Sequence, residues 1–342
     1  MTGLLALALR EGASDLHLAA GRVPNIRVDG QMRPLDLPPL EPATMRALLA
    51  QIMSERQQRE FEERRDLDFA VALPDAPRCR VNAFEQLHGA GAVLRLLPER
   101  VPSLEQLGLG EAFKRLVDVD SGLVLVTGPT GSGKSTTLAA LVEHLNRQRA
   151  LHILTLEDPV EFIHEPQRSQ VNQREIHRHS LGFAQALRAA LRQDPDVIML
   201  GELRDLETIR LALTAAETGH LVLATLHTAS AVKSVDRIVD VFAGEEKAMV
   251  RSLLAESLRA VVSQVLVPRA AGGRVAVQEI LVATPAVRNL IREGKQAQLY
   301  SAMQTGAGQG MQTLDSCLQG LLARGDISAQ SARANMRSPS AF

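Results

Sequence analysis

The residues best suited to chemistry lie in one run: Gly128, Pro129, Thr130, Gly131, Ser132, Gly133, Lys134, Ser135 and Thr136. An apolar run at 123–127 precedes it, and helical periodicity follows to residue 149. Glycines let backbone N–H groups close around phosphate oxygens, a lysine reaches the terminal phosphates, and a serine hydroxyl can ligate Mg²⁺. The run therefore predicts a site for ATP, with Ser135 on the metal. A chance match in an unrelated loop is disfavoured by the flanking strand and helix.

Two further apolar runs, at 153–156 and 197–200, are followed by carboxylates: Glu157, Asp158, Glu161 and Glu202. Carboxylates can orient a water, accept its proton or bind Mg²⁺. All four are therefore candidate catalytic residues, and Glu202 is also a candidate metal ligand opposite Ser135. A solvated acidic turn is the alternative for the first three, and a strand-end glutamate without a catalytic role is the alternative for Glu202.

Histidines flank a fourth apolar run, at 221–226. If this run is one extended strand, His220 and His227 lie roughly 23 Å apart at about 3.3 Å per residue, so they cannot share a metal within one subunit. His227, at the carboxyl end, is a candidate sensor of phosphate. His220 is expected to be structural or to lie at an interface, and simple packing is the alternative for both.

Arginines form the third group of candidates. A tight turn at 87–88 would place Arg80 opposite Arg95 on paired strands, where like charges repel. A nucleotide phosphate between the two guanidiniums would relieve that repulsion, so both are candidate catalytic residues. Screening of a surface pair by neighbouring carboxylates is the alternative.

Two other arginine pairs have a spacing of four residues. Arg188 and Arg192 would share one face of a helix, and with Arg204 they surround the run at 197–200. Arginine fingers and ordinary solvated charges both remain open for these three. The second pair lies on a predicted helix whose contacts the pattern does not identify; its candidate residues are Arg288, Asn289 and Arg292.

Two kinds of segment would position these side chains. Before residue 97 the sequence predicts a small α+β unit with a helical stretch at 41–65 and strands at 16–18, 26–30, 69–71, 80–84 and 92–96. A Pro-bearing segment at 97–103 marks a linker. After residue 121, short apolar runs, including one at 275–280, alternate with amphipathic segments. This alternation predicts a mostly parallel sheet whose ligands gather at the carboxyl ends of the strands. From residue 245 on we expect mainly helices and a polar tail.

The composition sets limits on fold and partners. The chain has 342 residues, 45% apolar and 23% charged, which fits two globular domains. A net charge of -1 disfavours nucleic acid as a partner. The apolar N-terminus lacks the positive start of a signal peptide and is expected to be a helix, and no run approaches a membrane span, so a cytoplasmic protein is expected. Cys79 and Cys317 are expected to be buried free thiols.

In combination, these segments resemble the secretion-superfamily ATPases, and among them the type IV pilus retraction ATPases. The likeness covers nearly the whole chain, through Ala-Ser-Asp-Leu-His at 13–17, the glycine-rich loop, Leu-Glu-Asp-Pro at 156–159, Gly-Glu-Leu-Arg-Asp at 201–205, the two histidine segments within 218–228 and the helix around Arg288.

The resemblance implies an α/β fold. A PAS-like domain (1–97) and a linker (98–110) would precede a RecA-like P-loop ATPase domain with a C-terminal helical region (111–342). It implies that Glu157, Asp158 and Glu161 form an acidic box, that Glu202 is the Walker B acid, that His220 and His227 belong to a histidine box, and that Arg80 and Arg95 approach the nucleotide. The helix around Arg288 matches a motif associated with pilus disassembly, with Val287 in place of isoleucine.

The function implied is that of a homo-hexameric, Mg²⁺-dependent ATPase that powers pilus retraction and twitching motility. It would act at the cytoplasmic face of the inner membrane, without inserting into it, on a pilus platform protein. A sister retraction ATPase is a further candidate partner. A pilus-assembly or type II secretion ATPase is one alternative, although those proteins usually carry a longer N-terminal region and a four-cysteine metal element. A non-catalytic accessory subunit is another, disfavoured by Lys134, Glu157 and Glu202. A DNA-translocating ring is disfavoured by the near-neutral charge.

Overall fold

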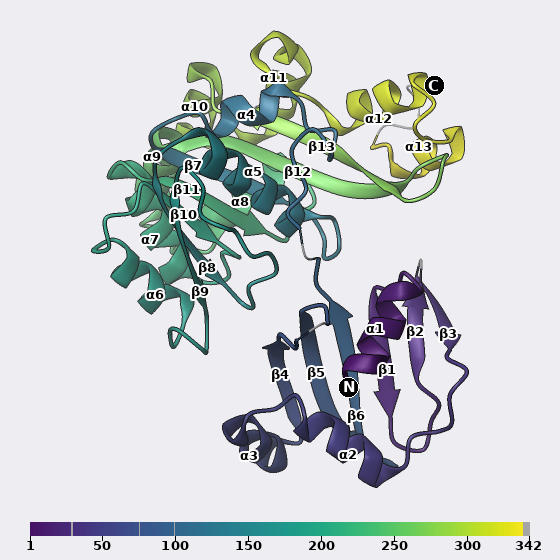
Figure 1. Cartoon of the computed structure of the whole chain (residues 1–342). Coiled ribbons are helices and arrows are strands. Elements are labelled where there is room, and N and C mark those ends of the chain that lie inside the picture. The colour runs from purple at the N-terminus through teal and green to yellow at the C-terminus, as the bar shows by residue number, and fades with distance from the viewer. Residues whose placement is uncertain (29, 75, 99, 338–342) are drawn as a thin grey trace. The chain divides into compact units, whose positions relative to one another are not determined.

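The computed structural model describes residues 1–28, 30–74, 76–98 and 100–337. Contacts divide the chain into an N-terminal unit, Met1–Arg100 with Pro159–Ile163, and a C-terminal unit, Val101–Asp158 with His164–Phe342 (Figure 1). Asp29 of a predicted strand, Glu99 of the predicted linker and the tail at 338–342 lie outside the described residues. The domain bounds 1–97, 98–110 and 111–342 stay a prediction.

The N-terminal unit is a six-stranded antiparallel sheet with three helices. Its elements are α1 (Thr2–Arg10), β1 (Asp15–Ala19), β2 (Asn25–Val28), β3 (Gln31–Pro34), α2 (Pro42–Ala50), α3 (Glu55–Arg64), β4 (Asp66–Val71), β5 (Cys79–Gln86) and β6 (Gly89–Leu96). The strand order is β3-β2-β1-β6-β5-β4. The five strands predicted here are confirmed, whereas β3 was missed because none of its side chains is buried.

The helical stretch predicted at 41–65 is two helices. The side chain of Ser54 accepts from the backbone N–H of Gln57 at 3.3 Å, and the Gln57 side chain accepts from the Ser54 N–H at 2.9 Å. This reciprocal capping box starts α3 afresh and separates it from α2.

The C-terminal unit is built around a seven-stranded sheet. Its strands are β7 (Gly122–Thr127), β8 (His152–Glu157), β9 (Gln170–Glu175), β10 (Val197–Leu200), β11 (Leu221–Leu226), β12 (Leu258–Pro268) and β13 (Arg274–Val282). The order is β13-β12-β7-β11-β10-β8-β9, and only the β12–β13 pair is antiparallel. The predicted α/β fold with a mostly parallel sheet is confirmed.

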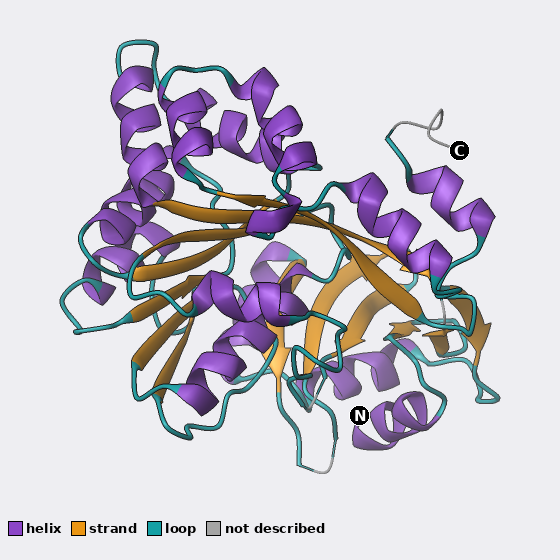
Figure 2. Cartoon of the chain, turned by 90° about the horizontal axis from the view of Figure 1, so that it is seen from above, coloured by secondary structure: helices purple, strands orange, loops and turns teal. Residues whose placement is uncertain are grey.

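Helices cover both faces of this sheet (Figure 2). They are α4 (Glu111–Val117), α5 (Lys134–Gln148), α6 (Phe183–Ala190), α7 (Leu206–Glu217), α8 (Ala231–Asp240), α9 (Lys247–Ser257), α10 (Pro285–Arg292), α11 (Leu299–Thr305), α12 (Leu314–Ala323) and α13 (Ala329–Asn335), with short 3₁₀ turns at Gln296–Gln298 and Ala307–Gln309. Alternate residues of β7 enter opposite cores: Leu123 and Leu125 pack with α6 to α9, whereas Val124 and Val126 pack with α4 and α5. Burial on both faces explains the continuous apolar runs of the central strands.

The expectation of mainly helices after residue 245 is wrong in one important place. β12 is an eleven-residue strand beside β7, and it begins at the residue after α9 ends. No Gly or Pro separates the two elements, so the sequence carries no break there. The C-terminal half of β12 packs with β13, α12 and α13 in a separate apolar cluster around Val267 and Leu318.

Two smaller expectations can also be compared with the structure. None of the described helices has the length and apolar character required to span a bilayer. Cys79 and Cys317 are both free thiols, Cys79 buried and Cys317 partly so. Burial raises the pKa of the Cys79 thiol to about 12.

Candidate functional site

The glycine-rich loop lies between β7 and the start of α5. Three of its glycines have positive φ: +145° at Gly128, +77° at Gly131 and +86° at Gly133. A Cβ at Gly128 would lie 2.2 Å from the carbonyl oxygen of Gln264. Gly128 is therefore required both by its backbone conformation and by the strand beside it.

Two polar side chains of the loop, Ser132 and Lys134, are buried. Lys134 is 8% exposed, and its Nζ donates to the carbonyls of Gly128 (2.8 Å) and Pro129 (2.9 Å). The hydroxyl of Ser132 is buried and has no hydrogen-bond partner among the described residues. The first N–H groups of α5 have no intrahelical acceptor, and the hydroxyl of Ser135 lies exposed in the same turn. Such a loop suits a phosphate anion.

Glu157 and Asp158 lie at the carboxyl end of β8. Glu157 is 8% exposed, and its Oε1 accepts from the Thr155 hydroxyl (2.6 Å) and from the Gln173 amide (3.3 Å). Asp158 follows, half-buried. Glu161 belongs to the segment grouped with the N-terminal unit, so the three predicted acids are divided between two units.

Glu202 follows β10 and is the centre of a charged cluster. One carboxylate oxygen forms an ion pair with Arg204, and the other lies 3.3 Å from Nε2 of His227. The hydrogen bond to Glu202 raises the pKa of Arg204. β10 and β11 are parallel neighbours, so the structure brings Glu202 and His227 together at one sheet edge, as the sequence predicted.

His220 lies at the other end of β11. Its Nδ1 lies 3.0 Å from the Ala215 carbonyl near the end of α7, and its own carbonyl accepts from Gly122 (3.0 Å). These contacts place His220 at the amino ends of β7 and β11, opposite to the ends that the glycine-rich loop follows.

The register predicted for the arginine pair is confirmed. Arg80 and Arg95 are directly opposed on β5 and β6. Arg95 also forms an ion pair with the buried carboxylate of Asp15 at 2.9 Å, as the alternative of carboxylate screening foresaw. Arg80 is exposed and forms no ion pair with any described residue. The two arginines are therefore not equivalent.

The shared helical face predicted for Arg188 and Arg192 is wrong. Helix α6 ends at Ala190, and Arg192 lies in the turn after it. Asp194, which precedes Pro195, has a φ of +53°, so the chain does not return to a right-handed helix after this turn. Arg188 forms an ion pair with Glu207 on α7. Within the described part of the chain, Arg192 has no ion pair.

Comparison with known proteins fits this geometry. The family model described as "Type II/IV secretion system protein" matches residues 2–328. The chain belongs to this family. It is a secretion-superfamily ATPase, as predicted. It is similar to the "Type IV pilus retractation ATPase PilT" of Pseudomonas aeruginosa, with 60% identity over 342 residues, which cover all of this chain and 99% of that one.

Two more relatives support the same assignment. A "Twitching motility protein" of Neisseria gonorrhoeae is 53% identical over 311 residues, covering 91% of this chain and 83% of that one. The solved structure "Crystal Structure of the Pilus Retraction Motor PilT and Bound ADP" superposes with a TM-score of 0.93 at 43% identity, covering 100% and 98% of the two chains. Nucleotide binding and the α/β fold are therefore properties of this secretion ATPase.

In this secretion ATPase the Arg288 helix contacts the end of α9. The Arg288 guanidinium donates to the carbonyls of Ala255 (2.7 Å), Glu256 (2.5 Å) and Leu258 (2.9 Å), and its Nε donates to Ala283 (2.9 Å). Burial lowers its pKa. Arg288 thus satisfies the terminal carbonyls of α9.

The other two candidates on α10 are more exposed. Arg292 lies 4.0 Å from the Glu256 carboxylate, and Asn289 donates to Glu293 (3.0 Å). Within the described part of the chain, neither is hydrogen-bonded to backbone carbonyls as Arg288 is.

Sequence reasoning missed three residues of the site. Thr155 and Gln173 orient Glu157, and Gln264 contacts the glycine-rich loop from β12. Thr155 could have been found, because it alternates with Glu157 on one strand. Gln173 and Gln264 lie on strands that no apolar run clearly marked.

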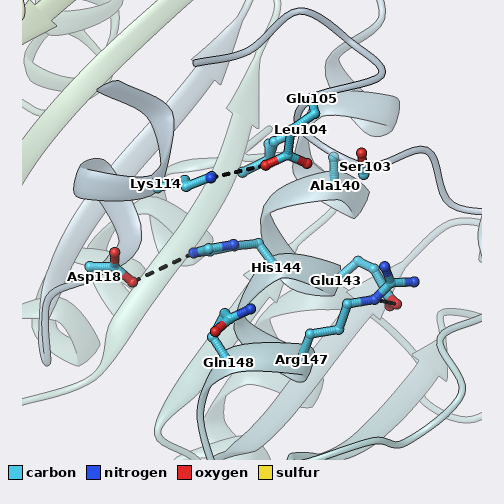
Figure 3. Close-up of a pocket in the computed structure, with 10 residues that line it drawn as sticks. All are labelled: Ser103, Leu104, Glu105, Lys114, Asp118, Ala140, Glu143, His144, Arg147 and Gln148. Carbon is cyan, nitrogen blue, oxygen red and sulfur yellow. Dashed lines mark hydrogen bonds and ion pairs between the residues drawn. The ribbon is translucent and has the colours of Figure 1, made fainter. Parts of the chain in front are cut away.

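A pocket of about 470 Å³ lies elsewhere in the C-terminal unit (Figure 3). It is lined by the second half of α5, by α4 and by residues 103–105, and none of the predicted site residues lines it. Its charges are largely paired: Lys114 with Glu105, Arg147 with Glu143, and His144 3.6 Å from Asp118. It has no glycine-rich backbone, and we do not assign the nucleotide to it.

Proposed function

We propose that this protein is the ATP-hydrolysing motor of type IV pilus retraction, with the glycine-rich loop as its phosphate site. One observation carries the proposal. The glycine-rich loop, His227, Glu202 and Glu157 all lie at the carboxyl ends of parallel strands of the same sheet. The full-length similarity to a relative named as a pilus retraction ATPase supports retraction, rather than assembly, as the process that ATP hydrolysis drives.

The loop residues bind and orient the triphosphate. Backbone N–H groups of the loop and of the first turn of α5 surround phosphate oxygens, and Lys134 exchanges its bonds to the Gly128 and Pro129 carbonyls for bonds to the terminal phosphates. Glu157, whose carboxylate accepts from Thr155, and Asp158 would position the attacking water and receive its proton.

The donor set also fits Mg²⁺. Ser135 and Glu202 offer oxygen ligands, and Mg²⁺ in such sites takes few protein ligands besides phosphate oxygens and water. To take part, the Glu202 carboxylate would exchange its contact with Arg204 or His227. When bound, the ion would neutralise charge on the phosphates.

The assembly we propose is a homo-hexamer at the cytoplasmic face of the inner membrane. In it, Arg80 and Glu161 would act on a nucleotide, and the exposed side chains of α10 would serve disassembly. The ring would pass its motion to a platform protein of the pilus machine and would act beside any sister retraction ATPase.

The direct test is ATP turnover by the purified protein. Lys134→Ala and Glu202→Ala should each lower kcat at least roughly a hundredfold while the melting temperature is kept. Lys134→Ala removes a positive charge from the phosphates, and Glu202→Ala removes a proposed ligand of the Mg²⁺ that would neutralise them. Turnover that is as high in both variants as in the wild type would reject this site.

A second test addresses direction. Deleting the gene should leave surface pili abundant but immobile, and the wild-type gene, but not the Lys134→Ala gene, should restore twitching. Loss of surface pili on deletion would instead identify an assembly ATPase.

A further inference from the structure

Gln264 on β12 lies directly beneath the glycine-rich loop. In the register of β12 with β7, Ser263 is opposite Thr127, so Gln264 comes level with the first residue of the loop. It is 1% exposed. A buried carboxamide has to find partners for both its donor and its acceptor ends.

Both ends are bonded to parts of the candidate nucleotide site. Its Nε2 donates to the carbonyl of Ser132 at 2.7 Å, and its Oε1 accepts from the Thr137 hydroxyl at 3.0 Å. The orientation of the amide is fixed, because a backbone carbonyl can only accept and therefore has to face the NH₂ group. A single side chain thus joins the loop to the first turn of α5.

The Ser132 carbonyl belongs to the same planar peptide as the N–H of Gly133. In a trans peptide these two groups point in opposite directions. Holding the carbonyl on β12 therefore turns the Gly133 N–H away from β12. A Cβ at Gly133 would lie 3.1 Å from Nε2 of Gln264, so the fit is close.

We propose that Gln264 is a positioning residue for nucleotide binding: it sets the orientation of the Ser132–Gly133 peptide, and the Thr137 hydroxyl holds the other end of its carboxamide in place. This inference rests on the proposed role of the loop as the phosphate site. Gln264 touches no phosphate itself; it acts by keeping an N–H donor aimed before the nucleotide arrives.

The test replaces Gln264 with methionine, which keeps the length of the side chain and removes both hydrogen bonds. We expect the KM for ATP and the Kd for ADP to rise roughly tenfold, with kcat changed less than about threefold, because a less ordered loop weakens ground-state binding. The matched control is Gln312→Met. Gln312 also donates to a backbone carbonyl, that of Gln278 at 2.9 Å, but it makes no contact with the loop. Its KM should stay at the wild-type value.

Thr137→Val provides a second route if Gln264→Met folds poorly. It removes one hydroxyl without a change of shape and should raise KM a few-fold. Combined with Gln264→Met it should add nothing, because the two side chains act through one another. Gln264→Glu should bind ATP poorly at pH 8 and better as the pH falls, since only a protonated carboxyl can donate to the Ser132 carbonyl.

Two outcomes would overturn the inference. One is wild-type KM and Kd in both Gln264→Met and Thr137→Val. The other is a rise in KM that only follows the loss of melting temperature and is equal in Gln312→Met. Failure of the proposed function would look different: Lys134→Ala would then hydrolyse ATP normally, whatever Gln264 does.

Discussion

Single charged residues in this protein differ in how much of their role is structural, and the opposed arginines show this. Arg95 forms an ion pair with the buried carboxylate of Asp15, whereas Arg80 forms none with any described residue. We expect Arg80→Ala to lower ATP turnover roughly tenfold or more with an unchanged melting temperature, since a guanidinium near the phosphates would stabilise transferred charge. Arg95→Ala should lower both turnover and melting temperature. Enzyme assays beside calorimetry separate the two, and wild-type turnover in both variants would refute the role.

A buried histidine gives a pH prediction at the same scale. His164 is 4% exposed, and burial lowers its pKa despite the Glu143 carboxylate 3.2 Å away. The unfolded chain, with a histidine pKa of about 6.5, therefore binds a proton more readily than the native one. The contribution of His164 to stability is complete above that pH and is lost as the pH falls below it. Denaturant unfolding at pH 7.5 and 5.5 should show a smaller difference in His164→Gln than in the wild type; equal differences would contradict the assignment.

At the scale of elements, Arg288 links two helices. Its donors satisfy carbonyls at the end of α9, so Arg288→Ala should lower the free energy of unfolding by about 2 kcal/mol. Arg292→Ala, on the same helix but with a long and exposed ion pair, should change it little. If both variants have the same free energy of unfolding, the hydrogen bonds of Arg288 contribute no more to stability than the ion pair of Arg292. A retraction defect in Arg292→Ala would therefore report on a partner more cleanly than one in Arg288→Ala.

How far an element could be predicted depended on how it is buried. β7, β10 and β11 are buried on both faces and appear as continuous apolar runs, so both the strands and the site residues at their ends were predictable. β9 is an edge strand of mostly polar residues, and β12 continues α9 without a break. Gln173 and Gln264 lie on these two strands, and their contacts join residues far apart in the chain. Local periodicity carries no information on such contacts.

At the scale of the whole molecule, much of the proposed function lies beyond one chain. Arg80 and Glu161 belong to the N-terminal unit, while the loop, Glu157 and Glu202 belong to the C-terminal unit. The similarity to PilT covers both units. A motor protein needs nucleotide-contacting residues on more than one unit. ATP hydrolysis can produce movement only if it changes the contacts of units that are able to change position.

A ring of coupled subunits makes a prediction that independent subunits do not. When wild-type chains and Lys134→Ala chains are co-expressed with different tags and purified through both tags, every assembly contains inactive subunits. Independent sites would lose activity in proportion to the inactive share, whereas coupled sites would lose more, since a blocked subunit also halts its neighbours. The matched control is co-expression with Lys247→Ala, a lysine on α9 that pairs with Asp240 and is remote from the loop in sequence. A strictly proportional loss of ATP turnover would mean that each subunit works alone, and the proposed motor would then need another source of coordination.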